Sequence, residues 1–237
     1  LMKFSFILLA HNEEKTIKDE IENLYNKIVK KFSYDYEVLI CEDGSTDNSK
    51  NIINSLKKNY DYKIIGSVAR KGVSQAMQDA FKVAKGEYIF FTDAGKKFEF
   101  DDFWKLYSEA KYNDLVSGLR VNRKDQKYRI FLTYMFNLFL KLFLKSKFKD
   151  IDSGFKIFKR SPLIEILNKK PLNSDFLSAE ICLKFQYKEF KVKEVRVDYF
   201  QRNEVSKALP IYKIPSLVFR FLLNFNKLKE ELKSYSH

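Results

Sequence analysis

Acidic residues stand at two places where an apolar run of the sequence ends. Glu42 and Asp43 follow the run 38–41, and Asp93 follows the run 88–92. In an α/β sheet, ligands bind beyond the carboxyl ends of the strands, so these carboxylates are expected to converge on one crevice. Carboxylate oxygens there accept hydrogen bonds from the N–H and hydroxyl groups of a ligand. Such a crevice suits a sugar nucleotide.

The composition favours an anionic partner. The chain has 237 residues, is 45% hydrophobic and carries a formal net charge of +13, which attracts polyanions. Because the sequence lacks a zinc-finger spacing, an aromatic RNA-binding signature and a recognition-helix pattern, we expect no nucleic-acid partner. Its basic residues are interleaved with Phe, Leu and Tyr, which favours an anionic membrane surface instead. Cys41 and Cys182 are predicted to be buried free thiols in a reducing compartment.

The first half of the chain alternates between apolar runs typical of strands and residues at helical spacing. We expect strands at 4–10, 37–41, 62–67, 88–92 and 114–118. We expect helices at 13–30, 47–56, 73–84 and 100–112, with Asp47 capping the second of them. This order predicts an α/β fold with a mostly parallel sheet covered by helices on both faces.

The second half is expected to contain helices at 128–147 and 176–187 and strands at 154–158 and 192–198. An amphipathic tail covers 209–224, where Pro210 and Pro215 predict two short helices. The apolar stretch 130–144 is interrupted by Lys141 and is too short to span a bilayer. The run 4–10 is too short for the apolar region of a signal peptide. We therefore expect neither a membrane-spanning helix nor a signal peptide.

A series of motifs occurs in order between residues 6 and 207. They are His11-Asn12-Glu13-Glu14, Glu42-Asp43-Gly44-Ser45, Arg70-Lys71-Gly72, Asp93-Ala94, Ser117-Gly118-Leu119-Arg120, Asp150-Ile151-Asp152-Ser153-Gly154-Phe155-Lys156, Glu180, and Arg202 leading to Ser206-Lys207. The series resembles family 2 glycosyltransferases of A-type fold (GT-A), in particular the branch of dolichyl-phosphate mannose synthases and polyprenyl-phosphate glycosyltransferases. The resemblance implies a Rossmann-like GT-A domain at 1–207, with a nucleotide-sugar half at 1–120, an acceptor half at 121–207 and a helical tail at 208–237.

The resemblance also implies which residues contact the nucleotide sugar. They are Ala10, His11, Glu13, Cys41, Asp43, Gly72, Asp93, Ala94 and Lys97. Asp43 and Glu13 are expected to accept hydrogen bonds from the nucleobase or ribose. A turn with a helix cap equally explains residues 43–47. Gly72 opens a helix after two basic residues, which either places N–H groups near a phosphate or is a plain helix start.

The second acidic group departs from the family pattern. There, an Asp-x-Asp pair with a Gln two residues further holds Mg²⁺ or Mn²⁺ against the donor diphosphate. This chain keeps Asp93, has Gly95 in place of the second Asp and has Lys97 in place of the Gln. Three hypotheses stay open: Lys96 or Lys97 pairs with the diphosphate directly, Asp93 binds a metal held mainly by substrate and water, or the domain binds nucleotide without catalysis.

The family resemblance assigns phosphate contacts to Arg120, Arg129, Arg202 and Lys207, because an anionic lipid phosphate needs positive charge more than a general base. Asp150, Ser153 and Lys156 match its acceptor side, where Asp150 equally suits loop capping.

The expected activity is inverting transfer of mannose or glucose from a nucleotide diphosphate sugar to a polyprenyl or dolichyl phosphate, by a peripheral protein on the cytoplasmic face of the membrane. The alternatives are a soluble transferase acting on a surface glycan and a domain that only binds nucleotide sugar. GDP and UDP remain equal as donors. The apolar faces of the helices 128–147 and 209–224 either pack on the sheet or lie in the membrane interface.

Overall fold

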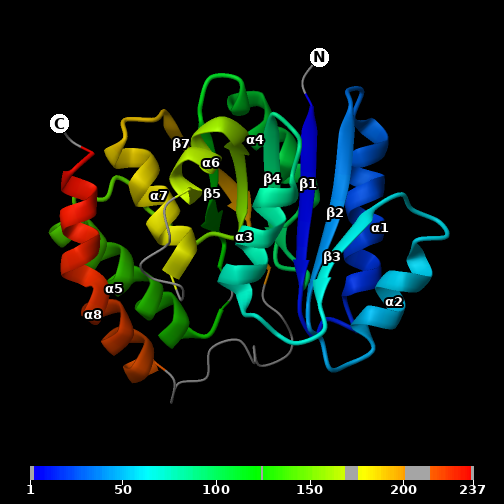
Figure 1. Ribbon diagram of the computed structural model, residues 1–237, viewed down its shortest axis with the longest axis horizontal. Helices are drawn as coiled ribbons and strands as arrows, with labels where there is room; N and C mark the ends of the chain where they lie inside the picture. Colours follow the sequence, from blue (N-terminus) through cyan, green and yellow to red (C-terminus); the bar gives the residue numbers. More distant parts are fainter. Residues whose placement is uncertain (1–2, 124, 169–175, 201–213, 236–237) are drawn as a thin grey trace.

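A seven-stranded sheet runs through the molecule between two layers of helices (Figure 1). The computed structural model describes residues 3–123, 125–168, 176–200 and 214–235. The strands lie in the order β3 (Lys63–Ser67), β2 (Tyr36–Asp43), β1 (Phe4–Ala10), β4 (Tyr88–Asp93), β6 (Phe155–Lys159), β5 (Leu115–Val121) and β7 (Val192–Asp198). Strand β6 is antiparallel to both of its neighbours, and the other pairings are parallel. The predicted mostly parallel sheet is confirmed.

Alternating side chains of the central strands divide the core between the two faces of the sheet. Ile7 and Leu9 of β1 pack under one helical layer, which consists of α3 (Val73–Val83), α5 (Lys127–Leu144), α6 (Arg160–Leu167), α7 (Leu177–Tyr187) and α8 (Ile214–Lys233). Phe6 and Leu8 pack under the other layer, which consists of α1 (Ile17–Lys27), η1 (Val29–Lys31), α2 (Ser49–Leu56), η2 (Phe100–Asp102) and α4 (Phe103–Ala110). The two-sided burial of these strands explains their continuous apolar runs.

Several helices differ from the sequence prediction. Helix α1 begins at Ile17 instead of residue 13, because residues 11–14 bond to the neighbouring loop and the carbonyl oxygen of Glu13 caps the first turn. The predicted helix 100–112 is a 3₁₀ turn followed by α4. Helix α6 was not predicted, because it starts directly at the end of β6 and has only 8 residues. Asn48, not Asp47, is the residue before α2, although Asp47 Oδ1 accepts the N–H of Ser49 at 2.9 Å.

The tail contains a helix that is longer than expected. Helix α8 continues past Asn224 to Lys233, with Pro215 in its first turn, where a missing N–H leaves no hydrogen bond unmade. The prediction of two short helices is therefore wrong for residues 214–233, and Pro210 lies outside the described residues. Among the described residues, no helix combines the length and the apolarity needed to cross a membrane.

Helices α5 and α8 lie side by side at one end of the molecule (Figure 1). The ring of Phe221 packs against Phe136 and Phe139 of α5. Buried Lys184 of α7 pairs with Glu231 of α8 at 3.1 Å and with its own neighbour Glu180 at 2.7 Å. The C-terminal helix is thus attached to α5 by apolar contacts and to α7 by an ion pair.

Candidate active site

The loops that follow β1 and β2 are bonded to each other along the carboxyl edge of the sheet. The ring Nδ1 of His11 lies 2.8 Å from the carbonyl oxygen of Asp43 and donates to it. The N–H of Asn12 donates to Ser45 Oγ at 3.0 Å, and the N–H of Glu13 donates to Ser49 Oγ at 2.8 Å. The motif at 11–14 therefore holds two strand ends in fixed relative positions. Glu13 Oε2 also accepts a hydrogen bond from Thr16.

Asp43 links these loops to a third one. Its Oδ1 accepts the N–H of Lys71 at 2.8 Å and its Oδ2 accepts the N–H of Gly72 at 3.0 Å, and the residue is buried. A carboxylate oxygen has more than one acceptor site, so these bonds do not exhaust Asp43. Gly44, with a φ of +60°, lies so close to Arg70 that a Cβ there would collide with its backbone. The structure thus places Asp43 as an organiser of the loop that leads into α3.

Three other residues expected to contact nucleotide have buried side chains. Ala10 and Ala94 lie in the core, and the N–H of Ala94 donates to the carbonyl oxygen of Leu9 at 2.8 Å. Cys41 is buried as expected, its thiol lies 3.3 Å from the carbonyl oxygen of Ala76, and burial raises the pKa of the thiol to about 12. These side chains belong to the core, Ala10 and Ala94 on one face of the sheet and Cys41 on the other.

Asp93 ends β4 and faces an ammonium group. Lys97 Nζ lies 3.8 Å from Asp93 Oδ2, and the two side chains are 25% and 29% exposed. Lys96 turns the other way and pairs with Asp19 on α1. A Cβ on Gly154 would collide with the Asp93 carboxylate, so only glycine lets the loop 150–154 approach this closely. Asp93 and Lys97 consequently lie beside the loop 150–154.

The loop that carries Lys97 is fixed from two sides. Buried Glu20 accepts the N–H of Lys96 at 2.7 Å, and the carbonyl oxygen of Lys97 accepts the N–H of Phe200 at 2.8 Å. Burial raises the pKa of Glu20 to about 7, against the opposing hydrogen bond from Lys96 and the charges of Lys97 and Lys96. Nothing in the sequence pattern singled out Glu20, because it occupies an ordinary core-facing position of α1.

The residues around Asp93 do not fit a protein-held divalent cation. Hard cations require several oxygen ligands, but within the described ranges no group of three His, Cys, Asp or Glu side chains is arranged to hold a metal. Gly95 offers no side chain, and the Lys97 ammonium faces the one carboxylate that remains. An ammonium group supplies charge but no ligand for a metal.

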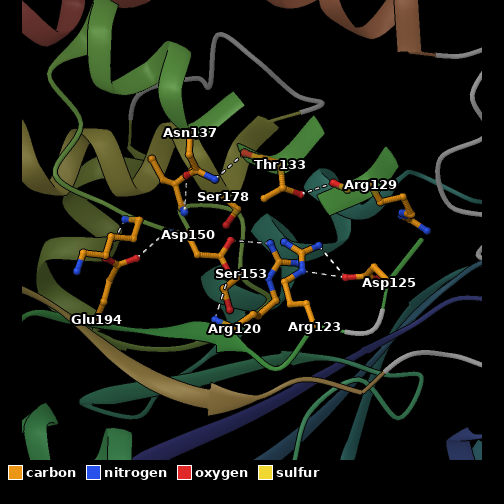
Figure 2. A network of polar contacts seen from close by, with 12 residues as sticks. Arg120, Arg123, Asp125, Arg129, Thr133, Asn137, Asp150, Ser153, Ser178 and Glu194 are labelled. Carbon is orange, nitrogen blue, oxygen red and sulfur yellow. Dashed lines mark hydrogen bonds and ion pairs between the residues drawn. The ribbon is translucent and has the colours of Figure 1, made fainter. Parts of the chain in front are cut away.

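Arg120 and Asp150 form a locked ion pair beside this loop (Figure 2). Arg120 donates from Nε and Nη2 to the two Asp150 oxygens, both at 2.6 Å, and the side chains are 10% and 5% exposed. Burial alone raises the pKa of Asp150, but the hydrogen bonds and charge of Arg120 hold it below its usual value. Glu194 accepts the N–H of Asp150 at 2.9 Å, and Tyr199 lies under the guanidinium. Loop anchoring is the role that the structure gives to both members.

The other cations predicted to contact phosphate are placed differently. Arg129 lies in the first turn of α5, and its guanidinium makes no ion pair with any residue that the structure describes. Figure 2 shows its side chain directed away from the Arg120–Asp150 pair. Arg123, which sequence reasoning did not select, pairs with Asp125 at 2.8 Å and also lies over Tyr199. Arg202 and Lys207 lie outside the described residues.

The three residues predicted on the acceptor side, Asp150, Ser153 and Lys156, are buried, whereas the neighbouring Asp152 is exposed. Lys156 is fully buried and donates to the carbonyl oxygens of Ile151 and Ser153 and, at 2.9 Å, to Ser178 Oγ, so it supports the loop from below. Ser153 is also buried. Asp152, which precedes Ser153, is exposed, and desolvation raises its pKa, opposed by Arg120 and Lys156 and reinforced by Asp150 and Asp93. A carboxyl of this kind is suited to exchanging a proton.

Comparisons with known proteins agree on one family. Its model, described as Glycosyl transferase family 2, matches residues 5–167. A poly(ribitol-phosphate) beta-glucosyltransferase of Bacillus spizizenii is 33% identical over 127 residues, 49% of this chain and 19% of that protein. A poly-beta-1,6-N-acetyl-D-glucosamine synthase of Staphylococcus epidermidis is 29% identical over 121 residues, 50% of this chain and 28% of that protein.

A third relative acts on a lipid-linked sugar. The Escherichia coli UDP-Glc:alpha-D-GlcNAc-diphosphoundecaprenol beta-1,3-glucosyltransferase WfaP is 35% identical over 100 residues, 42% of this chain and 36% of that protein. The matched segment thus spans about a third or less of each of these relatives.

The fold is shared with solved structures of glucosyl-3-phosphoglycerate synthase from Mycobacterium tuberculosis. The complex with Mn²⁺, UDP and glucosyl-3-phosphoglycerate has a TM-score of 0.73 at 14% identity and covers 97% of this chain and 80% of that chain. The complex with Mn²⁺, UDP and phosphoglyceric acid has a TM-score of 0.74 at 14% identity and covers 96% and 78%. At this identity the likeness shows the fold.

Proposed function

The chain belongs to glycosyl transferase family 2 and has the GT-A fold, and from this premise we propose that it transfers a hexose from a UDP-sugar to a polyprenyl phosphate at the cytoplasmic face of a membrane. The observation that carries the proposal is the meeting of two loop groups at one sheet edge. Loops 11–14, 43–49 and 70–72 form the nucleotide side, while loops 93–97 and 150–154 form the side of the sugar and acceptor.

The donor side supports a UDP-sugar. The two neighbouring structures described above contain UDP, and the relatives are named for glucosyl or N-acetylglucosaminyl transfer. We assign the nucleotide to the edge where Asp43 ends β2 and holds the loop that leads into α3. Relatives named for beta linkages agree with inversion, in which the acceptor oxygen attacks the anomeric carbon opposite the departing diphosphate.

The membrane part of the proposal rests on helices α5 and α8. Several large apolar side chains of these helices face solvent: Phe131, Tyr134, Met135, Leu142 and Phe143 on α5, and Val218, Phe219, Leu222 and Leu223 on α8. Basic residues flank them, including Lys127, Lys145, Arg220 and Lys227. Apolar side chains with basic neighbours bind at the interface of anionic bilayers. A surface of this chemistry would bring the cleft to a polyprenyl acceptor.

Vesicle flotation tests the membrane part. We expect the protein to float with vesicles containing anionic lipid and much less with neutral ones. Replacing Phe131 and Phe219, which are 60% and 63% exposed, by Ser is expected to reduce flotation. Tyr112→Ser is the matched control, since Tyr112 is 62% exposed at the end of α4 on the opposite helical layer. Equal flotation of all variants would contradict the assignment of α5 and α8, and dimers that form without vesicles would indicate self-association instead.

A second acceptor class is favoured by one observation, the exposed Asp152 with its raised pKa. A sugar hydroxyl must lose its proton when it attacks, whereas a lipid phosphate is already anionic and needs no base. If the acceptor is a hydroxyl group, Asp152 is the carboxylate placed to receive that proton. Transfer to a lipid-linked or soluble glycan is therefore the alternative activity.

A transfer assay distinguishes the two. Labelled UDP-glucose, UDP-GlcNAc and GDP-mannose are each supplied with undecaprenyl phosphate, a sugar-linked undecaprenyl diphosphate or a soluble oligosaccharide. We expect a UDP-sugar and undecaprenyl phosphate to give labelled lipid, with little change in Asp152→Asn. A product that appears only with hydroxyl acceptors and falls roughly 100-fold in Asp152→Asn would establish the alternative. No product from any donor and acceptor pair would contradict the proposed activity.

A further inference from the structure

We propose that the ammonium group of Lys97 replaces a divalent cation at this site and binds the donor diphosphate directly, so that nucleotide loading needs no metal. The inference rests on the proposed function, because it assumes that the ligand is a nucleotide diphosphate sugar. It goes further by naming the group that handles the leaving diphosphate. It is carried by the geometry around Asp93 at the carboxyl end of β4.

The ammonium group of Lys97 lies near Asp93 without a tight hydrogen bond to it. Lys97 Nζ lies 3.8 Å from Asp93 Oδ2, which is longer than the roughly 2.7–2.9 Å of a tight charged hydrogen bond. Both side chains keep about a quarter of their surface exposed. Lys97 is thus held near the acid by charge but retains donors for a second anion, since an ammonium group has three.

The two consecutive lysines, Lys96 and Lys97, pair with different carboxylates. The carboxylate of Asp19 pairs with Lys96 on the side of α1, away from Asp93. Both Gly95 and Lys96 have positive φ, 111° and 51°, and this turn sends consecutive side chains in different directions. Glu20 holds the turn at the N–H of Lys96. Of the two lysines, Lys97 is therefore the one that pairs with Asp93.

Lys97 and Asp93 contact two other segments, residues 199–200 and the loop 150–154. The carbonyl oxygen of Lys97 accepts the N–H of Phe200, and Phe98 bridges to Tyr199, so the lysine is attached to the same segment that underlies Arg120. A Cβ on Gly154 would collide with Asp93 Oδ2, the oxygen that also faces Lys97. A diphosphate placed against Lys97 would thus adjoin the acceptor-side loop, where transfer must occur.

The chemical role follows from this placement. When the acceptor oxygen bonds to the anomeric carbon, the bond from that carbon to the diphosphate oxygen breaks and its electron pair stays on the diphosphate. Lys97 hydrogen-bonds to the oxygens that gain this charge and keeps its proton. Lysine is an effective point charge for phosphate, and positioned cations stabilise a departing nucleotide.

Calorimetric titration with UDP tests the inference, in EDTA and in Mn²⁺. We expect the wild-type protein to bind UDP with the same affinity in both. Lys97→Gln is expected to bind roughly 10–100-fold more weakly, the loss typical of one hydrogen bond to a charged group. Lys96→Gln is the matched control and is expected to bind like the wild type, because Lys96 pairs with Asp19 of α1 and not with Asp93.

The variant Gly95→Asp with Lys97→Gln rebuilds the pattern of the family and provides the opposite test. We expect it to bind UDP tightly in Mn²⁺ and weakly in EDTA. UDP binding by the wild type that disappears in EDTA, or unchanged affinity in Lys97→Gln, would overturn the role of Lys97 and leave the proposed function standing. Absence of nucleotide binding in every variant and buffer would overturn both.

Discussion

Two aspartate–cation pairs lie in the same part of the molecule, and they differ in how tightly each cation is held. Arg120 is bound through two 2.6 Å hydrogen bonds to Asp150, and little of either side chain is exposed. Lys97 lies 3.8 Å from Asp93, and about a quarter of each side chain is exposed. One pair is buried and bidentate, while the other is open and held by charge alone.

The difference indicates which cation a ligand can use. A ligand that recruits Arg120 must break two short hydrogen bonds and leave Asp150 buried without its partner, which is costly. A diphosphate that recruits Lys97 displaces only a loose contact of a kind worth little to folding. The family resemblance had assigned a phosphate contact to Arg120 and had placed Lys97 among the residues that contact the nucleotide sugar. From this geometry we infer loop anchoring for Arg120 and propose ligand binding for Lys97.

Breaking the locked pair is expected to have the largest effect. Arg120→Ala leaves the Asp150 carboxylate buried and unpaired, so the free energy of unfolding should fall by about 3–5 kcal/mol. Urea denaturation of the variant and the wild type measures this loss of unfolding free energy. Arg196→Ala, at an exposed position of β7, is the control and should change stability by less than about 0.5 kcal/mol. The double variant Arg120→Ala with Asp150→Ala should recover part of the loss, and equal stability of Arg120→Ala and wild type would contradict the anchoring role.

Glu20 holds the loop that carries Lys97, and its contribution to the free energy of unfolding is expected to depend on pH. Glu20 has a pKa of about 7 in the folded protein and 4.5 ordinarily, so the folded state binds a proton that the unfolded state lacks between these values. Its contribution is full below about 4.5 and is lost as the pH rises through about 7. We expect wild-type stability, relative to Glu20→Gln, to fall by about 3 kcal/mol between pH 4.5 and pH 8. Parallel pH profiles of the two proteins would show that Glu20 titrates normally.

The smallest expected effect is that of Lys97 on folding. Because a partly exposed ion pair contributes about 0–1 kcal/mol, Lys97→Gln should unfold at nearly the same urea concentration as the wild type. Together with the loss of UDP affinity expected for this variant, the result would separate ligand binding from stability. A loss of stability as large as that of Arg120→Ala would mean that the two pairs do not differ in kind.

Much of the fold could be predicted from the sequence, because the central strands are buried on both faces and show continuous apolar runs. The direction of β6 could not, since residues 155–159 have the apolar content of a strand whichever way it runs. Pro215 misled the prediction of the tail, because a proline ends a helix only when it stands beyond the first turn.

The site was predicted as a set of residue types and not as a set of contacts. Asp43 was predicted to contact the nucleotide, and it ends β2, but its backbone partners, Lys71 and Gly72, are 28 and 29 residues away in the chain. The opposite directions of Lys96 and Lys97 depend on a turn that no local pattern marks. Lys156 was expected beside the acceptor, but its side chain is buried and donates a hydrogen bond to the carbonyl oxygen of Ile151 in the loop.

A crystal structure of the protein with UDP, grown in the presence of Mn²⁺, tests the central claim most directly. The account predicts Lys97 Nζ within about 2.7–2.9 Å of a diphosphate oxygen and no anomalous signal from manganese beside Asp93. A manganese ion that bridges Asp93 and the diphosphate, with Lys97 turned away, would contradict it.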